Sequence, residues 1–452
     1  MAARNEGLGL AYHIITYGCQ MNAHDSERLA GMLAMMGYHA TDDVDQADLV
    51  LMNTCCVRDN AERRVMGNVG FLREKKQRRE GMIVAVCGCM MQQPGVADAL
   101  VKKYPFVDIV FGTHNLPEFP RMLRRALIDG QPVRSVAEGD DAVVEGVPAL
   151  RRQGPLTFMN IMYGCNNFCA YCIVPYVRGR ERSRRLEDIL AEARQVAREG
   201  FKEITLLGQN VNSYADGRTD FAALLRALDT DPGLAGVERI RFMTSHPKDL
   251  SEGVMRVMAE GARICHQLHL PVQSGSTEIL KRMNRRYTRQ DYLDLVDRLR
   301  GFVPDVGLTT DIIVGFPGET DADYQDTLSL VERVGFQAAF TFQYSPRRGT
   351  PAAAMPDQVP DAVAKERLNQ LIALQERKTQ QVYQQMVGRR ETVLVEGVSA
   401  RNSAMVSGKT DGGVTVNFPG GVERIGRMVP VKIVQAKQHT LLGEAIAQEG
   451  GR

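Results

Sequence analysis

The chain has 452 residues, of which 44% are hydrophobic and 24% are charged, as is typical of a soluble globular protein. At this length about three domains are expected. The formal net charge is only +2. This excludes a global electrostatic field as the means of binding nucleic acid, so any such binding must depend on local basic patches.

The N-terminal part of the chain follows a strand–helix rhythm. Three apolar runs with strand composition, YHIITYGC, DLVLMNTC and MIVAVCGC, alternate with helical patterns. This alternation predicts a parallel sheet covered by helices over residues 11–128. Residues 129–153 hold glycine, proline and acidic residues with weak periodicity, and we interpret them as a linker.

A second strand–helix series occupies residues 154–384. Its candidate strands are LTFMNIMY, EITLLGQ, ERIRFMTS, HQLHLPVQ, VGLTTDIIVG and AAFTFQYS, with helical patterns between them. Six such units predict an incomplete (β/α)6 barrel rather than a closed barrel of eight, and active residues then belong at the carboxyl ends of the strands. Residues 358–387 have the pattern of one amphipathic helix.

The C-terminal part changes character. Residues 385–447 contain short apolar runs, ETVLVEGV, AMVSGKTDGG, VTVNFPGG and MVPVKIVQAK, separated by glycine-containing turns. This pattern predicts a small all-β barrel.

The sequence favours a reducing compartment. No apolar run approaches the roughly 18 residues of a membrane helix, and the start of the chain lacks the pattern of a secretory leader. We therefore expect a cytoplasmic protein with no membrane partner. Nine cysteines are present, several in close pairs or triplets, and in such a compartment clustered cysteines indicate metal binding or catalysis.

One cysteine triplet follows the first strand of the central series. Cys165, Cys169 and Cys172 have C-x3-C-x2-C spacing. A structural zinc site would need a fourth cysteine or histidine, yet no histidine lies nearby and the next cysteine, Cys265, stands alone and is expected in the core. Three thiolates with one open position suit an iron–sulfur cluster with one free iron. The alternative is a partial zinc site or three unrelated thiols.

A second set of cysteines lies in the N-terminal domain. Cys19, then Cys55 or Cys56, then Cys87 or Cys89 each lie at or just past the end of an expected strand. Because the carboxyl ends of parallel strands meet at one edge, one cysteine from each strand could help hold a second cluster. Alternatively, these are buried free cysteines, since this side chain packs well as a small apolar group.

The local sequences resemble the radical S-adenosylmethionine (SAM) methylthiotransferases. TYGCQMNAHDSE, NTCCVR and CGCMMQ are similar to the N-terminal domain of that family. GCNNFCAYCIVPYVRGRERSR, LLGQNVNSY, HLPVQSGS and DIIVGFPGET are similar to the rest of it, and the C-terminal barrel resembles the TRAM RNA-binding domain. The resemblance spans Tyr12 to about Ala445 and implies an α/β protein whose N-terminal parallel-sheet domain is followed by a partial radical-SAM barrel and the small β-barrel.

The resemblance also implies cofactors and their ligands: two [4Fe–4S] clusters and SAM. The implied ligands are Cys19, Cys55 and Cys89 for an auxiliary cluster, and Cys165, Cys169 and Cys172 for the cluster that binds SAM. Cys56 and Cys87 depart from the family pattern. We expect them to be structural or to hold a cluster during assembly.

The implied reaction is a tRNA modification by a transferase. One SAM would donate methyl to a sulfur held at the auxiliary cluster. A second SAM would be cleaved reductively, and the resulting radical would take the hydrogen from carbon 2 of N(6)-dimethylallyladenosine at position 37 of tRNA. The product would be 2-methylthio-N(6)-dimethylallyladenosine. The implied partners are tRNA, a cytosolic electron donor and a sulfur source, and we expect a monomer.

Three alternatives stay open at this stage. Relatives within the family modify an aspartate of a ribosomal protein or a threonylcarbamoyl-adenosine, although YGCQMN and LLGQNVNSY favour the tRNA type named above. A protein of another class would bind RNA through an iron–sulfur cluster without catalysis. Such a protein would not need glycine-bearing strand ends beside the C-x3-C-x2-C loop.

Candidate SAM-binding residues lie at the strand ends of the central series. Gly208 and Gln209 end the second strand, Gln273 and Ser274 end the fourth, and Gly315 ends the fifth. Glycine at these positions would let the backbone approach the cofactor closely. The alternative role for each is a simple turn or helix cap. No catalytic residue beyond the clusters is expected, because the cofactor carries the hard chemistry.

Two groups of basic residues are candidates for binding phosphate. The first follows the cluster loop and comprises Arg178, Arg180, Arg182, Arg184 and Arg185. The second lies in the C-terminal barrel and comprises Arg401, Lys409, Arg424, Arg427, Lys432 and Lys437. Aromatic residues are few in that barrel, Phe418 being the main one, so contact with the RNA backbone should dominate over base stacking.

Overall fold

The computed structural model describes residues 9–56, 59–136 and 143–446 and divides the chain into two compact units. Unit 1 comprises Met1–Arg152, Tyr163–Asn166 and Ile173–Arg182. Unit 2 comprises Gln153–Met162, Asn167–Cys172 and Ser183–Arg452. The chain therefore passes between the units within the very loop that carries the C-x3-C-x2-C cysteines.

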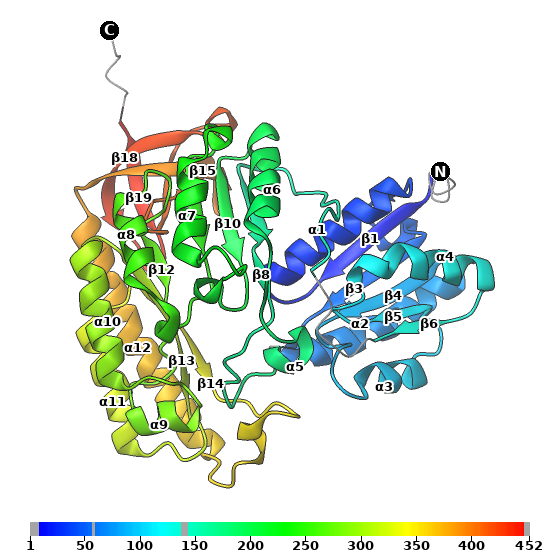
Figure 1. The fold of residues 1–452 in the computed structure, drawn as a ribbon, viewed down its shortest axis with the longest axis horizontal. Coiled ribbons are helices and arrows are strands. Elements are labelled where there is room, and N and C mark those ends of the chain that lie inside the picture. The colour runs from blue at the N-terminus through cyan, green and yellow to red at the C-terminus, as the bar shows by residue number, and fades with distance from the viewer. Residues whose placement is uncertain (1–8, 57–58, 137–142, 447–452) are drawn as a thin grey trace. The chain divides into compact units, whose positions relative to one another are not determined.

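Unit 1 is built on a six-stranded sheet with the order β2-β1-β3-β4-β5-β6, in which every pair is parallel (Figure 1). The strands are β1 (Ala11–Thr16), β2 (His39–Ala40), β3 (Leu49–Thr54), β4 (Ile83–Gly88), β5 (Ile109–Phe111) and β6 (Val133–Ser135). The three expected strands are β1, β3 and β4, so the predicted parallel sheet is confirmed. Strand β6 lies inside the stretch interpreted as a linker.

An apolar core lies on each face of this sheet. Strands β3 and β4 are therefore buried almost throughout, as in a parallel sheet that is covered on both sides. The helices are α1 (Gln20–Met35), α2 (Asp59–Arg78), α3 (Val96–Lys103), α4 (Phe119–Asp129) and α5 (Val174–Arg178), with short helical turns η1 (Val44–Gln46) and η2 (Leu116–Glu118). Helix α5 comes from the segment after the cysteine loop, and its Val177 is buried in the core of this unit.

Unit 2 contains the expected six-stranded partial barrel, whose strands pair in parallel as β11-β10-β7 and β12-β13-β14. A parallel bridge between Ile240 and Ile264 continues the order from β11 toward β12. The strands are β7 (Leu156–Asn160), β10 (Glu203–Leu207), β11 (Arg239–Phe242), β12 (Gln267–His269), β13 (Gly307–Val314) and β14 (Ala338–Gln343). Two short strands, β8 (Met162–Tyr163) and β9 (Arg182–Ser183), pair separately.

Helices cover the outside of the partial barrel, and α12 (Asp361–Met386) is the long amphipathic helix that the sequence predicts (Figure 1). The other helices are α6 (Leu186–Arg198), α7 (Phe221–Thr230), α8 (Glu252–Glu260), α9 (Thr277–Arg282), α10 (Arg289–Phe302) and α11 (Asp321–Val334), with turns η3 (Val211–Ser213), η4 (Pro232–Leu234), η5 (Pro247–Asp249) and η6 (Pro351–Ala354). Among the described residues, none of the helices has the length and apolar character needed to cross a membrane.

The C-terminal segment of unit 2 is a closed β-barrel with the order β15-β16-β17-β19-β18. Its elements are β15 (Arg390–Ser399), β16 (Asn402–Lys409), β17 (Thr415–Pro419), η7 (Val422–Arg424), β18 (Met428–Ala436) and β19 (Leu441–Ala445). The predicted small all-β barrel is confirmed, and β19 adds a strand to the four that were expected. Phe418 is fully buried in its core, so this ring is not available for base stacking.

The β-barrel docks on the partial barrel through β15 and the turn after β16. Arg239 Nη2 donates to Thr392 O at 2.7 Å, and Arg241 Nη2 donates to Thr410 O at 2.7 Å. Both arginines come from β11 and both are buried. The β-barrel therefore meets the amino-terminal ends of the partial-barrel strands, which leaves the carboxyl ends for the cofactor.

Candidate cluster sites

Three cysteines of unit 1 come to the carboxyl edge of its sheet. Cys19 follows β1 and precedes α1, Cys55 directly follows β3, and Cys89 directly follows β4. These strands are neighbours in the sheet. The thiols of Cys19 and Cys89 each lie 3.8 Å from Oδ1 of Asn22, and Cys55 packs against Gly18. Three cysteines that are distant in the sequence therefore lie at the same edge of the sheet.

Asn22 organises this edge through its side-chain amide. Its Nδ2 donates to Tyr17 O and to Thr54 O, both at 2.9 Å, so the residue ties the end of β1 to the end of β3. Its Oδ1 consequently faces the thiols. Gly18 adds the space that Cys55 requires, because its φ is +114° and a Cβ there would lie 2.7 Å from the Cys55 sulfur. Sequence reasoning did not identify Asn22, whose signal is only its place one helical turn after Cys19.

Cys87 and Cys89, one of the two cysteine pairs that the strand ends left ambiguous, lie in different surroundings. Cys87 is buried in the core with Leu51 and Phe111, and burial raises the pKa of its thiol. Cys89 packs in the core on the other face of the sheet, and the pKa of its thiol is lowered to about 6. The largest cause is a hydrogen bond with Cys56. Burial raises this pKa, but the nearby Arg178 lowers it further. A thiolate is the form that binds metal, so these surroundings favour Cys89 as the ligand.

Arg178 and Arg184 do not belong to a phosphate-binding strip. Arg178 is buried in unit 1, where its Nε lies 3.1 Å from the Cys89 sulfur and its Nη2 pairs with Asp25 at 2.8 Å. Arg184 is buried in unit 2, where its Nη1 pairs with Glu192 at 2.6 Å. The sequence interpretation was wrong for these two arginines because packing buries each guanidinium beside a carboxylate of its own unit. Arg180 and Arg185 are exposed, and Arg182 is half-buried.

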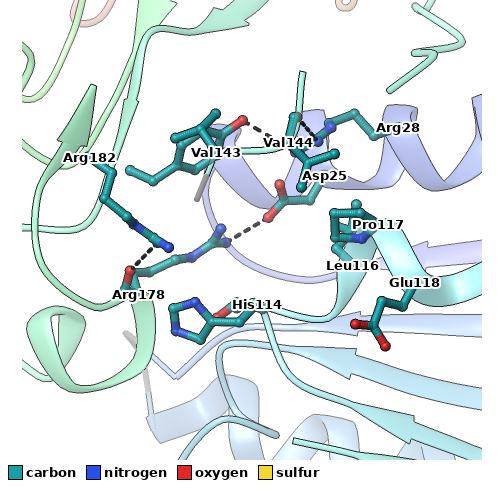
Figure 2. A pocket seen from close by; sticks show the side chains of 12 residues that line it. Asp25, Arg28, His114, Leu116, Pro117, Glu118, Val143, Val144, Arg178 and Arg182 are labelled. Atoms are coloured by element: carbon teal, nitrogen blue, oxygen red, sulfur yellow. Dashed lines mark hydrogen bonds and ion pairs between the residues drawn. The ribbon is translucent and has the colours of Figure 1, made fainter. Parts of the chain in front are cut away.

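A cavity of about 320 Å³ opens beside Arg178 within unit 1 (Figure 2). Figure 2 shows the side chains of Arg178 and Asp25, which both line the cavity, pointing toward one another, with His114 next to Arg178. The cavity is lined by Asp25, Arg28, Thr113, His114, Leu116, Pro117, Glu118, Val143, Val144, Tyr163, Arg178 and Arg182. The guanidinium that contacts Cys89 therefore also borders an open space at the same sheet edge.

Cys165 belongs to unit 1 and is held by the backbone of the following segment. Its N–H donates to Gly179 O at 3.1 Å, and the N–H of Asn166 donates to Glu181 Oε1 at 3.0 Å. Gly164 has φ of +78° and passes so close to Arg180 O that a Cβ would collide with it. The backbone on both sides of Cys165 is therefore fixed by its neighbours within unit 1.

Cys169 and Cys172 belong to unit 2 and form a tight turn, in which Cys172 N–H donates to Cys169 O at 2.9 Å. The sulfur of Cys169 lies 3.6 Å from Nη1 of Arg285. Arg285 is buried, and its Nη2 donates to Pro271 O at 2.5 Å. In the sequence Arg285 is one of several basic residues, with Arg282, Arg286 and Arg289, and nothing there indicates its burial beside Cys169.

The donor chemistry of both cysteine sets fits iron–sulfur clusters. Thiolates are soft ligands that favour such clusters, and each set has a buried guanidinium beside a thiol, Arg178 at Cys89 and Arg285 at Cys169. Over residues 9–56, 59–136 and 143–446, no three Cys, His, Asp or Glu side chains already stand around one point as metal ligands do. Within unit 1, Cys19, Cys55 and Cys89 follow the ends of neighbouring strands.

Three expected SAM-binding positions follow partial-barrel strands, one at a close approach of the backbone to a side chain and one with an unusual backbone conformation. Gly208 follows β10, where a Cβ would lie 2.6 Å from Cγ of Met162, and Gln209 comes next, half-buried. Gln273 has a φ of +71°, which is rare for a residue with a side chain, and its N–H donates to Asp311 O at 2.9 Å. Such strained residues cluster at functional sites.

Ser274 and Gly315 are engaged with the protein itself. The Ser274 hydroxyl accepts a hydrogen bond from the Ser276 N–H at 3.2 Å and is fully buried. Gly315 has a φ of +70°, and a Cβ there would lie 2.5 Å from Cβ of Ala364 on α12. Its N–H donates to Glu319 Oε2 at 2.7 Å. At Gly315 the close backbone approach is therefore made to a helix.

Three family profiles match successive parts of the chain. One is described as an uncharacterized protein family, UPF0004, and covers residues 11–112. The Radical SAM superfamily covers residues 159–331, and the TRAM domain covers residues 384–446.

Curated relatives match almost from end to end. A tRNA-2-methylthio-N(6)-dimethylallyladenosine synthase of Caldicellulosiruptor saccharolyticus is 52% identical over 440 residues, 97% of this chain and 93% of the relative. Proteins of the same name from Thermoanaerobacter sp. and Clostridium perfringens are 51% and 50% identical, covering 99% and 96% of this chain and 95% and 97% of the relatives. The chain belongs to this family of synthases. It is a radical-SAM tRNA methylthiotransferase that acts on N(6)-dimethylallyladenosine, and its cofactors are SAM and two [4Fe–4S] clusters.

Solved structures show the same fold at low identity. The radical SAM methyltransferase TsrM from Kitasatospora setae has a TM-score of 0.57 at 18% identity, covering 76% of this synthase chain and 77% of its own. The cobalamin-dependent SAM radical enzyme OxsB has a TM-score of 0.53 at 15% identity, covering 81% of this chain and 56% of its own. These likenesses concern the fold alone.

Proposed function

We propose a division of the cysteines between the two clusters of this tRNA methylthiotransferase. The SAM-binding cluster would be held by Cys165, Cys169 and Cys172, and the auxiliary cluster by Cys19, Cys55 and Cys89. The observation that carries the second assignment is the convergence of three neighbouring strand ends on Asn22, whose Oδ1 lies 3.8 Å from two of the thiols. When bound, the clusters and SAM supply the reductive cleavage and the sulfur chemistry.

The residues of the chain would orient these groups. Gly208, Gln209 and Gln273 are proposed to contact SAM, since they follow strands of the partial barrel; Gly208 is closely packed and Gln273 has a left-handed backbone conformation. Ser274 and Gly315 make close contacts with the protein itself. They would therefore act on SAM indirectly, by fixing the backbone conformation of the loops that contact it. Cys56 would provide a hydrogen bond to Cys89 and not a metal bond.

We further propose that the modified adenosine is that at position 37 of the tRNA. An anticodon loop can present an unstacked base to an active site, as single-stranded RNA generally does. The protein would act as a cytoplasmic monomer. It would take electrons from a separate cytosolic donor and sulfur from a separate source, because the chain offers only the thiols that hold the clusters and a few buried cysteines.

The assignment is tested by counting iron and sulfide after anaerobic reconstitution. The native chain should hold about eight irons, since each cubane carries four. Replacing Cys165, Cys169 and Cys172 together by alanine should leave about four, and so should replacing Cys19, Cys55 and Cys89. Cys265→Ala is the matched control, because this cysteine is buried in unit 2 and outside both sets, and it should keep the full count.

Activity is followed on the same samples by mass spectrometry of nucleosides from a tRNA bearing N(6)-dimethylallyladenosine. Loss of either set should abolish the methylthio product. A native count of about four irons that falls to none on removing Cys165, Cys169 and Cys172 would show that the N-terminal cysteines hold no cluster. The proposed division of the ligands would then be refuted.

A further inference from the structure

We propose that Arg178 is a positioning residue for the auxiliary cluster, and that its guanidinium raises the reduction potential of this cluster through charge and hydrogen bonding at the Cys89 sulfur. The inference rests on the proposed assignment of Cys19, Cys55 and Cys89 as the ligands of that cluster. It gives a function to a side chain that the sequence pattern placed in an RNA-binding strip.

The contacts of Arg178 fix its guanidinium in one orientation. Its Nε lies 3.1 Å from the Cys89 sulfur, its Nη2 lies 3.0 Å from Asn22 Oδ1, and the same Nη2 lies 2.8 Å from Asp25 Oδ2. Only 7% of the side chain of Arg178 and 5% of that of Asp25 are exposed. A planar guanidinium can serve these partners together, whereas a lysine ammonium presents its protons from a single atom.

Anchoring of the backbone explains why the guanidinium reaches this position. Arg178 ends the short helix α5 (Val174–Arg178). Ile173 and Val177 of this segment are buried in the core of unit 1, and Thr113 Oγ1 donates to Val177 O at 2.6 Å. The residue therefore arrives at the sheet edge on a segment that packing holds in place. In sequence it lies six residues after Cys172.

The sign of the effect follows from the charge of the cluster. Reduction adds an electron, so a nearby cation and an N–H donor to a ligand sulfur stabilise the reduced form and raise the potential. Asp25 opposes this effect, because its carboxylate pairs with the same guanidinium. Removing the charge of Arg178 should consequently lower the potential, and removing the charge of Asp25 should raise it. Opposite signs from two partners of one ion pair would not result from a merely structural role.

The experiment isolates the auxiliary cluster in the full-length chain, with Cys165, Cys169 and Cys172 replaced by alanine. In this background the midpoint potential is measured by redox titration monitored by electron paramagnetic resonance. The variants are Arg178→Gln, Arg178→Lys and Asp25→Asn. Arg125→Gln is the matched control, because Arg125 lies on α4 of the same unit with 72% of its side chain exposed.

We expect the potential to fall in Arg178→Gln, to fall less in Arg178→Lys, to rise in Asp25→Asn and to stay unchanged in Arg125→Gln. An Arg178→Gln protein with full iron and the potential of the control would overturn the proposal. Shifts of the midpoint potential that have the same sign in Arg178→Lys and Asp25→Asn would also overturn the proposal. This comparison provides the test if the Arg178→Gln protein does not hold iron. Absence of iron in the background with native Arg178 would instead refute the ligand assignment on which the proposal rests.

Discussion

Gly18 determines at the residue scale how closely the ends of β1 and β3 approach one another. Its backbone has a φ of +114°, and a Cβ would collide with the side chain of Cys55. Gly18→Ala should therefore displace Cys55 and reduce the iron bound by the auxiliary site, so that the reconstituted chain loses up to about four of its irons. Iron and sulfide counts measure this loss directly.

Gly81→Ala is the control that separates the effect of backbone strain from the effect of the collision with Cys55. Gly81 also has a positive φ, +81°, but nothing lies within 4 Å of the place its Cβ would take. This variant should lose only the roughly 1–2 kcal/mol that a left-handed alanine costs and should keep its iron. Equal iron in both variants would mean that Cys55 does not need the space beside Gly18, and the role given to this glycine would be wrong.

Sequence reasoning at the residue scale could select candidates where the side chain itself indicates a chemistry. Thiols at strand ends indicate a metal site, so Cys19, one of the 55/56 pair and one of the 87/89 pair could be predicted, whereas the choice of Cys55 and Cys89 came from the family resemblance. Arg178 could not be recognised, because a guanidinium is equally suited to phosphate and to a buried ion pair. Only the depth at which packing places it distinguishes the two roles, and this depth is a property of the tertiary structure.

Elements were predictable in proportion to their apolar length. The six expected partial-barrel strands and the long helix α12 are all present, although β12 keeps only three residues of the apolar run HQLHLPVQ that predicted it. Strands β2, β5 and β6 have two or three residues each, too few for a pattern of alternation, and they exist because neighbouring strands offer them an edge. Strand β19, Leu441–Ala445, was missed because LLGEA contains glycine and a charge.

The docking of the β-barrel on the partial barrel depends on β11. Arg241 reaches across from this strand: its Nη1 donates to Asp411 O at 2.7 Å, and its Nε pairs with the buried Glu203 at 3.0 Å. Arg241→Met leaves Glu203 buried without its partner, which should cost about 3–5 kcal/mol. Urea unfolding followed by circular dichroism should show a lower midpoint for this variant.

A second substitution tests whether the unpaired charge of Glu203 causes the lower stability of Arg241→Met. Adding Glu203→Gln to Arg241→Met removes the unpaired carboxylate and should restore part of the lost stability, as a double-mutant cycle would register. Arg256→Met is the matched control, because Arg256 is exposed on α8. If Arg241→Met unfolds at the same urea concentration as Arg256→Met, the guanidinium does not hold the two barrels together.

At the scale of the whole molecule, binding of tRNA must come from placement of charge, because the net charge is only +2. The β-barrel keeps Arg401, Arg427, Lys432 and Lys437 exposed, whereas Lys409 pairs with Glu396. Its one large aromatic side chain, Phe418, is in the core. Contact with phosphates, and not stacking, is therefore the interaction that this surface can offer.

Such contacts have a definite dependence on salt. Each phosphate neutralised by a cation releases counterions, so the logarithm of the association constant falls linearly with the logarithm of salt concentration. Arg427→Gln, Lys432→Gln and Lys437→Gln should each weaken tRNA binding and make this slope shallower by about 1. Arg226→Gln is the matched control, because Arg226 is exposed on α7 and is not part of the β-barrel. A slope in the three variants equal to that of the control would show that the tRNA backbone is held elsewhere.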